Sequence, residues 1–305
     1  MRISHWIKNG FVAAPLLFSG KFMEPWPWIE TALAVLVFGL LASAVYMIND
    51  VCDAEKDRLH PVKRNRPVAS GRLSPTSAVL GGVGLALLAY ALMAAEVAIT
   101  TNGRRIGGSD MLLMSWASVY LAINLLYSFW LKRLAILDVL MVAMGFVVRA
   151  MAGAAAIEVP VSPWLVVCTL SLTLFIALTK RRSEVTELDA SHASNVRAAN
   201  REYTPALLEY MLTVATSMAI ITYTLYCLAP STIQRFHSSH MVWTIPLVIY
   251  GLFRYNMLTR QAGKNDPVKV LLKDATIWYV VGAYVAMTAI LWRFGRLPGI
   301  TDILG

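Results

Sequence analysis

The sequence predicts an all-α protein that crosses a membrane many times. Of its 305 residues, 57% are hydrophobic and only 15% are charged, whereas soluble domains average roughly 45–50% and 25%. Long uncharged runs also recur along the chain, and each approaches the roughly 20 residues that a helix needs to cross a bilayer. Together, the two observations argue against a soluble globular enzyme.

Nine apolar runs are candidates for transmembrane helices. In chain order they are Ile7–Phe22, Thr31–Ile48, Ser77–Ala98, Met111–Leu131, Leu134–Ile157, Ser162–Thr179, Tyr210–Ala229, Met241–Leu258 and Ala275–Trp292. The first is the weakest candidate, because it is short and contains Lys8, whose amine must reach the interface. The eighth contains Arg254. We expect one domain, residues 1–305, with nine helices around a central cavity that opens to the cytoplasm.

The distribution of positive charge predicts how the chain is oriented. Lys and Arg total 27, Asp and Glu total 18, and the net charge is +9. On an apolar chain this excess indicates a membrane surface or an anionic substrate rather than nucleic acid. With the amino terminus inside, the inner segments hold twenty Lys and Arg residues, with Arg254 counted among them, the outer segments hold six, and Arg149 lies inside a span. The positive-inside rule therefore predicts an inner (plasma) membrane protein whose charged clusters face the cytoplasm. Cys52, Cys168 and Cys227 are too scattered for a disulfide framework or a zinc site.

An acidic cluster follows the second expected span. If the helix continues, Asp50, Asp53 and Asp57 lie within about 60° of one another on one face. Three carboxylates repel one another unless a cation lies between them, and Mg²⁺ binds one or two carboxylates together with phosphate oxygens. A solvated helix end is the simpler interpretation of a lone acidic run. A basic tract follows directly, however: Arg58, Lys63, Arg64, Arg66 and Arg72. Carboxylates that can bind a metal, next to arginines that can bind phosphate oxygens, indicate a site for a diphosphate group.

Two ionisable residues lie inside an apolar span. Asp138 and Arg149 are eleven residues apart, about 16 Å along a helix. A charge at such depth costs about 2.5–3.5 kcal/mol on insertion scales and normally faces a cavity or a partner. We favour the cavity, and a structural ion pair with a neighbouring helix is the alternative. Lys132, at the inner end of the fourth span, is explained equally well by topology alone.

The motif around the acids resembles a known family. Asn49-Asp50-x-x-Asp53-x-x-x-Asp57, followed by Arg66-Pro67 and Ser70-Gly71, is similar to the first signature of the UbiA superfamily of nine-helix intramembrane transferases. Five further segments resemble its branch of decaprenyl-phosphate phosphoribosyltransferases: Trp6-Ile7-Lys8-Asn9, Tyr127-Ser128-x-x-Leu131-Lys132, Gly145-Phe146-x-x-Arg149-Ala150, Lys180-Arg181-Arg182-x-Glu184 and Tyr250-Gly251-x-Phe253-Arg254-Tyr255. These segments span nearly the whole chain.

One departure from the wider superfamily supports that branch. Members that ionise a prenyl diphosphate usually carry a second aspartate-rich motif after the sixth span, for a second metal. This chain instead has the basic run Lys180-Arg181-Arg182 at that place, followed by scattered acids. The difference agrees with a diphosphate that belongs to a sugar donor.

The resemblance implies a reaction and a set of site residues. The reaction is Mg²⁺-dependent transfer of 5-phosphoribose from phosphoribosyl pyrophosphate to a polyprenyl phosphate, with release of pyrophosphate. The catalytic candidates are Asn49, Asp50, Asp53 and Asp57, and the three aspartates are the candidate metal ligands. The candidates for substrate binding are Lys8, Lys63, Arg64, Arg66, Tyr127, Lys132, Asp138, Arg149, Lys180, Arg181, Arg182 and Arg254. Which cations bind the donor and which bind the lipid phosphate stays open.

Two other functions are compatible with the same features. One is a prenyltransferase that moves a prenyl chain from a prenyl diphosphate to an aromatic acceptor. The other is a lipid-phosphate transporter or binding protein, although inner charges without an outward exit argue against transport. The expected partners are both substrates and membrane lipids, with no nucleic acid, and a homo-oligomer is left open.

Overall fold

The structure is a computed structural model that describes residues 8–59, 63–101, 109–191, 202–261 and 274–294. All regular elements in this part of the chain are helices, which confirms the all-α class. The chain divides into two compact units, of which the first runs to Pro160 and the second begins at Val161. That residues 1–305 act as one domain, around one cavity, stays a prediction.

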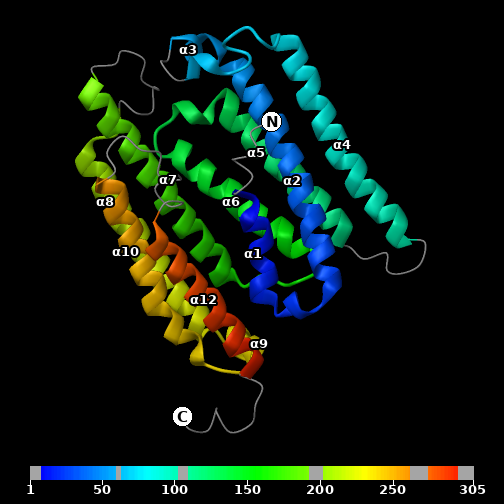
Figure 1. The fold of residues 1–305 in the computed structure, drawn as a ribbon, viewed down its shortest axis with the longest axis vertical. Helices are drawn as coiled ribbons and strands as arrows, with labels where there is room; N and C mark the ends of the chain where they lie inside the picture. The colour runs from blue at the N-terminus through cyan, green and yellow to red at the C-terminus, as the bar shows by residue number, and fades with distance from the viewer. Residues whose placement is uncertain (1–7, 60–62, 102–108, 192–201, 262–273, 295–305) are drawn as a thin grey trace. The chain divides into compact units, whose positions relative to one another are not determined.

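The first unit is built on two long helices and their partners. Its helices are α1 (Gly10–Ser19), α2 (Pro25–Cys52), α3 (Ala54–Arg58), α4 (Pro75–Thr101), α5 (Ser109–Phe129) and α6 (Leu137–Ala156). Helix α2 packs along α4, while α1 and α5 both pack against α6 (Figure 1). The core between them includes Phe38, Leu41 and Tyr120, each almost fully buried. This packing of apolar faces therefore determines where the ends of α2 and α5 lie in space.

The described part of the second unit contains five α-helices. They are α7 (Pro163–Ser191), α8 (Pro205–Leu228), α9 (Pro230–Phe236), α10 (Ile245–Gln261) and α12 (Ala275–Phe294). Helices α7, α8 and α9 each begin with proline, whose fixed φ and missing N–H suit the first helical position. Thr204 caps α8, because its side-chain oxygen accepts from the Leu207 N–H at 3.2 Å. Helix α7 packs along α8, and α10 along α12.

Seven helices of the described chain are long and apolar enough to cross a membrane. They are α2, α4, α5, α6, α7, α8 and α12. The expected spans 7–22 and 241–258 contain α1 and most of α10, but α1 has only ten residues and α10 seventeen. Gly20 ends α1 in the left-handed conformation, with φ 73°, and a 3₁₀ turn at His240–Thr244 delays the start of α10. The count of nine spans therefore stays a prediction.

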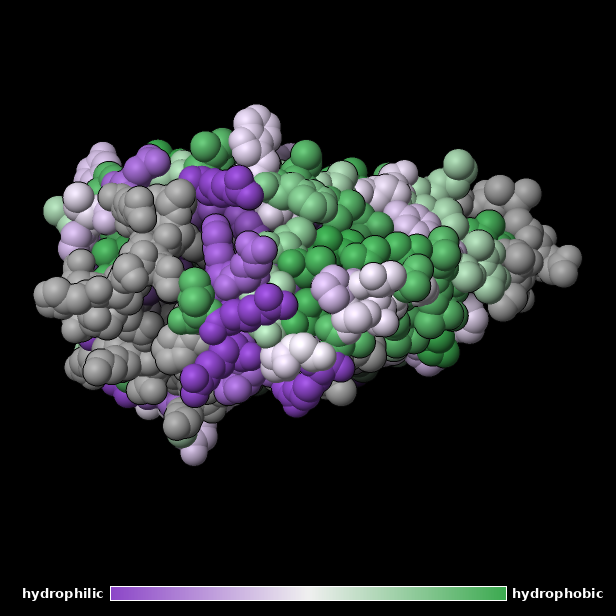
Figure 2. Space-filling model, turned by 90° about the horizontal axis from the view of Figure 1, so that it is seen from above, coloured by the Kyte–Doolittle hydropathy of each residue, from purple (hydrophilic) through white to green (hydrophobic). Residues whose placement is uncertain are grey.

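The outer faces of these helices are apolar. On α4, Leu80 is 67% exposed and Leu87 is 65% exposed, and only 22% of the apolar segment of this helix is buried. Figure 2 shows a broad hydrophobic area next to a band of hydrophilic residues. Exposed leucines on this scale are unfavourable in water and favourable in lipid.

A single glycine sets how closely α1 approaches α6. A Cβ atom added to Gly153 would lie 1.9 Å from the carbonyl oxygen of Val12. Because that contact is with backbone, no side chain can turn aside to relieve it. Gly153 therefore permits the close packing of α1 on α6, as small residues do between membrane helices.

We expect Gly153→Ala to lower the free energy of unfolding by about 1–3 kcal/mol or more, because the added methyl forces α1 away from α6. The measurement is thermal unfolding of the purified protein in detergent. Gly84→Ala on α4 is the matched control, since nothing lies within 4 Å of the added Cβ. Equal stability of the two variants would contradict the packing described for α1.

Candidate functional site

The acidic cluster lies where α2 ends and α3 begins. Helix α2 ends at Cys52, and Asp53, with φ −102° and ψ 3°, separates it from α3. The turn is still hydrogen-bonded like a helix, because the Asp53 N–H donates to Asn49 O at 2.9 Å and the Asp57 N–H to Asp53 O at 2.8 Å. Asp50 and Asp57 are buried, at 8% and 5% exposed, and Asp53 is half-buried.

A folded loop brings an arginine to the two buried acids. Nη1 of Arg66 donates to Asp57 Oδ2 at 2.6 Å and lies 3.5 Å from Asp50 Oδ1. The loop is shaped by its own backbone bonds, such as the one from the Ser70 N–H to Arg66 O at 2.8 Å, and by Gly71 at φ 77°. One guanidinium therefore holds the carboxylates of Asp50 and Asp57 side by side.

The third acid has a different partner. Nζ of Lys132 lies 2.6 Å from Asp53 Oδ1. Lys132 belongs to the short 3₁₀ turn Leu131–Arg133 that follows α5, and it is only 9% exposed. The predicted cluster and two of its predicted cations thus come together from three separate segments of the first unit.

The donor set suits a divalent cation in part. Asp50 and Asp57 share one face, and two carboxylates completed by phosphate oxygens are a usual set for Mg²⁺. Asp53 does not join them, and among the described residues no three His, Cys, Asp or Glu side chains are grouped to bind a metal. The geometry therefore fits a metal held by two carboxylates, whereas the expected set of three stays a prediction.

Arg149 lies apart from this cluster, in the interior of α6. It is 6% exposed, and its guanidinium donates to Asn9 Oδ1 at 3.2 Å, Gly145 O at 3.1 Å and the Tyr120 hydroxyl at 2.7 Å. Its Cζ also lies 4.7 Å from the centre of the Tyr120 ring. Asn9 and Tyr120 were missed as site residues, although Asn9 is part of the Trp6–Asn9 segment.

Arg182 serves the packing of the second unit. It is buried and donates to Glu209 Oε1 at 3.0 Å, Asn256 Oδ1 at 3.0 Å and Thr259 Oγ1 at 3.1 Å. These contacts join α7 to α8 and α10. Arg181 pairs with Glu184 on its own helix, and Lys180 is exposed.

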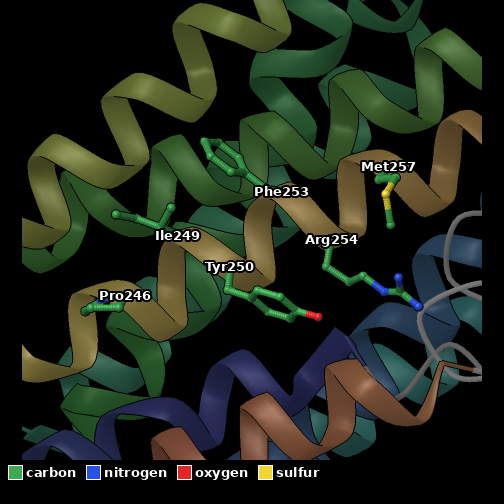
Figure 3. A pocket seen from close by; sticks show the side chains of 6 residues that line it. All are labelled: Pro246, Ile249, Tyr250, Phe253, Arg254 and Met257. Carbon is green, nitrogen blue, oxygen red and sulfur yellow. The ribbon is translucent and has the colours of Figure 1, made fainter.

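Arg254 also has an acidic partner. Its Nη2 lies 2.7 Å from Asp274 Oδ2, and Asp274 Oδ1 accepts from the Ile277 N–H at 2.9 Å at the start of α12. The Arg254 guanidinium, and then the Ile277 N–H, lower the pKa of the Asp274 carboxyl below its usual value. Tyr250 and Arg254 extend from the same side of α10 (Figure 3). They border a groove of about 460 Å³ whose lining is Pro246, Ile249, Tyr250, Phe253, Arg254 and Met257.

The remaining candidates lie at the ends of elements or in loops of the first unit. Asp138 is fully buried in the first turn of α6. Asn49 and Tyr127 are half-buried in the last turns of α2 and α5. The other three are half-buried Lys8, before α1, and half-buried Lys63 and exposed Arg64 in the 3₁₀ turn Lys63–Asn65. Their roles stay predictions, as do those of Lys180–Arg182 and Arg254.

We expect Arg182→Gln to lower the free energy of unfolding by about 1.5–3 kcal/mol, because it removes hydrogen bonds of a buried charged group. Arg260→Gln is the matched control. Arg260 also pairs with Glu209, but its side chain is 57% exposed, and such surface pairs contribute about 0–1 kcal/mol. Denaturant unfolding of both variants in detergent is the measurement, and equal losses would contradict a structural role for Arg182.

Comparison with known proteins identifies the family. The UbiA prenyltransferase family model matches residues 10–280. The decaprenyl-phosphate phosphoribosyltransferase of Mycolicibacterium smegmatis is 32% identical over 298 residues, which cover 93% of this chain and 88% of that protein. The enzyme of the same name from Corynebacterium glutamicum is 30% identical over 292 residues, covering 93% and 83%.

A solved structure shows the same fold. The UbiA homolog from Archaeoglobus fulgidus, bound to GPP and Mg²⁺, aligns with a TM-score of 0.67 and 17% sequence identity, over 94% of this chain and 98% of that one. The apolar helices and the family match together make this chain a multi-pass membrane protein. It belongs to the UbiA prenyltransferase family of transferases.

Proposed function

We propose that this protein transfers 5-phosphoribose from phosphoribosyl pyrophosphate to a polyprenyl phosphate and releases pyrophosphate. One observation carries the proposal. Three acids between the last turn of α2 and α3 pair with two cations, Arg66 and Lys132, and this pairing supports adjoining sites for a metal and for a diphosphate. The proposal is supported by the names of the relatives that are 30–32% identical over most of this chain.

The buried acids would hold the metal. Asp50 and Asp57 would bind Mg²⁺ together with phosphate oxygens of the donor. When bound, Mg²⁺ neutralises charge that develops on the departing diphosphate. Arg66 now bonds to both acids. With the metal bound, its guanidinium would turn from them to the diphosphate oxygens, for which its planar fork is suited.

Lys132, the cation that pairs with Asp53, would bind the diphosphate of the donor as well. Its amine is nearly buried against Asp53, whose carboxylate orients it. A fixed positive charge in a water-poor site stabilises a leaving diphosphate more than the same charge does in water. Lys63 and Arg64 lie in the same loop as Arg66, where they would extend the anionic site.

The reaction is a substitution at the anomeric carbon. The bond from that carbon to the diphosphate oxygen breaks, and the electron pair leaves with pyrophosphate. An oxygen of the lipid phosphate forms the new bond to the carbon, which passes through a state of oxocarbenium character. A phosphate anion is already nucleophilic, so the step needs no general base.

The side of the membrane follows from charge. The expected inner segments contain twenty Lys and Arg residues and the outer segments six, and the positive-inside rule then favours the cytoplasmic side of the inner membrane for the acidic cluster. A water-soluble sugar donor and a membrane-held lipid phosphate can both reach such a site. The two units would then act as one transferase domain.

The direct test supplies the purified protein with labelled donors. With a polyprenyl phosphate and Mg²⁺, we expect radioactive phosphoribosyl pyrophosphate to give a lipid product and stoichiometric pyrophosphate, because the proposed donor carries its diphosphate on the sugar. Consumption of a labelled prenyl diphosphate with an aromatic acceptor would instead support a prenyltransferase. Movement of lipid phosphate across vesicles without donor consumption would support a transporter.

Matched variants tie the activity to the acids. In the same assay, Asp50→Asn and Asp57→Asn should each lower turnover by on the order of 10²–10³-fold, the usual cost of losing a group that stabilises a developing charge. Glu55→Gln is the control, because Glu55 is an exposed acid on α3. Full activity in both asparagine variants would contradict the assignment.

A further inference from the structure

A buried positive charge in the first unit has only neutral partners. The three groups that accept from the Arg149 guanidinium are an amide oxygen, a backbone carbonyl and a hydroxyl. No carboxylate of the described residues forms an ion pair with it. Burial of an unneutralised guanidinium is costly, and the three bonds use three of its five N–H donors.

A second donor beside it lacks an acceptor. Asn9 is 1% exposed, and its Oδ1 accepts from Arg149 Nε at 3.2 Å. Because the oxygen of the amide accepts this bond, the amide nitrogen, Nδ2, points elsewhere. Nδ2 is a buried donor with no hydrogen-bond partner. A buried donor left unpaired costs about 1–3 kcal/mol, so an acceptor at this place would be favourable.

The start of α1 adds a third source of positive potential. Asn9 lies in a 3₁₀ turn that leads directly into this ten-residue helix, and its side chain makes no capping bond. The first N–H groups of a helix have no partner within the helix, and they carry the positive end of its dipole. Because Asn9 bonds Arg149, the guanidinium, the free amide donor and the helix start lie together. Such a group of donors binds anions such as phosphate.

The surroundings indicate how the anion arrives. Val12, Val148 and Ala152 are each 1% exposed or less, and they belong to the apolar core of the unit. Phe146 adds a ring whose centre is 5.3 Å from the guanidinium carbon. Arg149 itself lies well inside a helix that is long enough to cross a membrane. A phosphate that reaches this depth is one that is attached to an apolar chain.

We propose that Arg149, Asn9 and the start of α1 bind the phosphate monoester of the lipid acceptor. The inference rests on the proposed function and refines it, because it separates an acceptor site from the donor site at Asp50, Asp57 and Arg66. Tyr120 is a positioning residue, since its hydroxyl and ring hold the guanidinium. The basic run Lys180–Arg182 is not needed for this role.

The test replaces the amide of Asn9 by a carboxylate. Asn9→Asp keeps the oxygen that accepts from Arg149 and adds a counter-charge, so the fold should be retained. It also removes the free donor and repels a phosphate. We expect binding of farnesyl phosphate to the purified full-length protein, measured by calorimetry in detergent, to weaken at least tenfold. Binding of phosphoribosyl pyrophosphate and the melting temperature should not fall.

Three further measurements make the result specific. Gln234→Glu makes the same change at an exposed residue of α9 and should bind farnesyl phosphate like the unaltered protein. Asn9→Ala, which removes the donor without adding charge, should weaken binding severalfold. Farnesol and inorganic phosphate should each bind the unaltered protein more weakly than farnesyl phosphate, because each lacks one half of the ligand.

Each contrary result overturns the inference. Unchanged binding of farnesyl phosphate in Asn9→Asp would show that the site does not bind phosphate. Loss of phosphoribosyl pyrophosphate binding alone would assign the site to the donor, and farnesol binding as tight as farnesyl phosphate binding would exclude recognition of the phosphate. If the expected binding pattern holds while the unaltered protein forms no product from phosphoribosyl pyrophosphate, the proposed function fails and the phosphate site stands.

Discussion

The pairing of buried acids with cations from two other segments is the interaction on which the candidate site depends. Asp50 in the last turn of α2 and Asp57 in α3 are almost fully buried, where an uncompensated carboxylate would be costly. Arg66 compensates both, and Lys132 compensates Asp53. The loop after α3 and the turn after α5 are therefore held where the charges meet. Packing of α2 on α4 and of α5 on α6 brings these ends close enough for the contacts to form.

The same arrangement explains how one site can serve an anionic substrate. Under the proposed function, the cations that pair with the acids in the protein alone would bind diphosphate oxygens once a divalent metal is bound by the acids. Removal of one member of a buried pair leaves the other uncompensated. On substrate binding, the acids would thus exchange the cations for the metal, and the cations would exchange the acids for the diphosphate. Each charge would keep a partner of opposite sign.

Much of this could be predicted from the sequence. Composition predicted the all-α class, run length predicted nine spans, of which seven are long apolar helices in the described chain, and the spacing of Asp50, Asp53 and Asp57 predicted the acidic cluster. Spacing could not show that the helix ends at Cys52, that Arg66 bridges two acids, or that Asp53 pairs with Lys132, because these depend on contacts distant in sequence. Hydropathy also could not separate a full span from the short α1, which a left-handed Gly20 ends.

The sequence did not indicate which of the buried arginines has an acidic partner. Arg182 and Arg149 both follow apolar sequence, yet Arg182 has Glu209 as a partner whereas Arg149 has only neutral acceptors. Only the second arrangement leaves a positive charge that an anion can balance. The difference lies in the neighbouring helices, which a local motif does not describe.

The central claim is that the acids at the end of α2 hold a divalent cation against the diphosphate of the donor. The most direct measurement replaces Mg²⁺ by Mn²⁺ and records electron–nuclear double resonance with phosphoribosyl pyrophosphate bound. The account predicts ³¹P coupling to the metal in the unaltered protein and in Glu55→Gln, and its loss in Asp57→Asn. Coupling that persists in Asp57→Asn, or Mn²⁺ that remains coordinated by water alone in the unaltered protein, would contradict it.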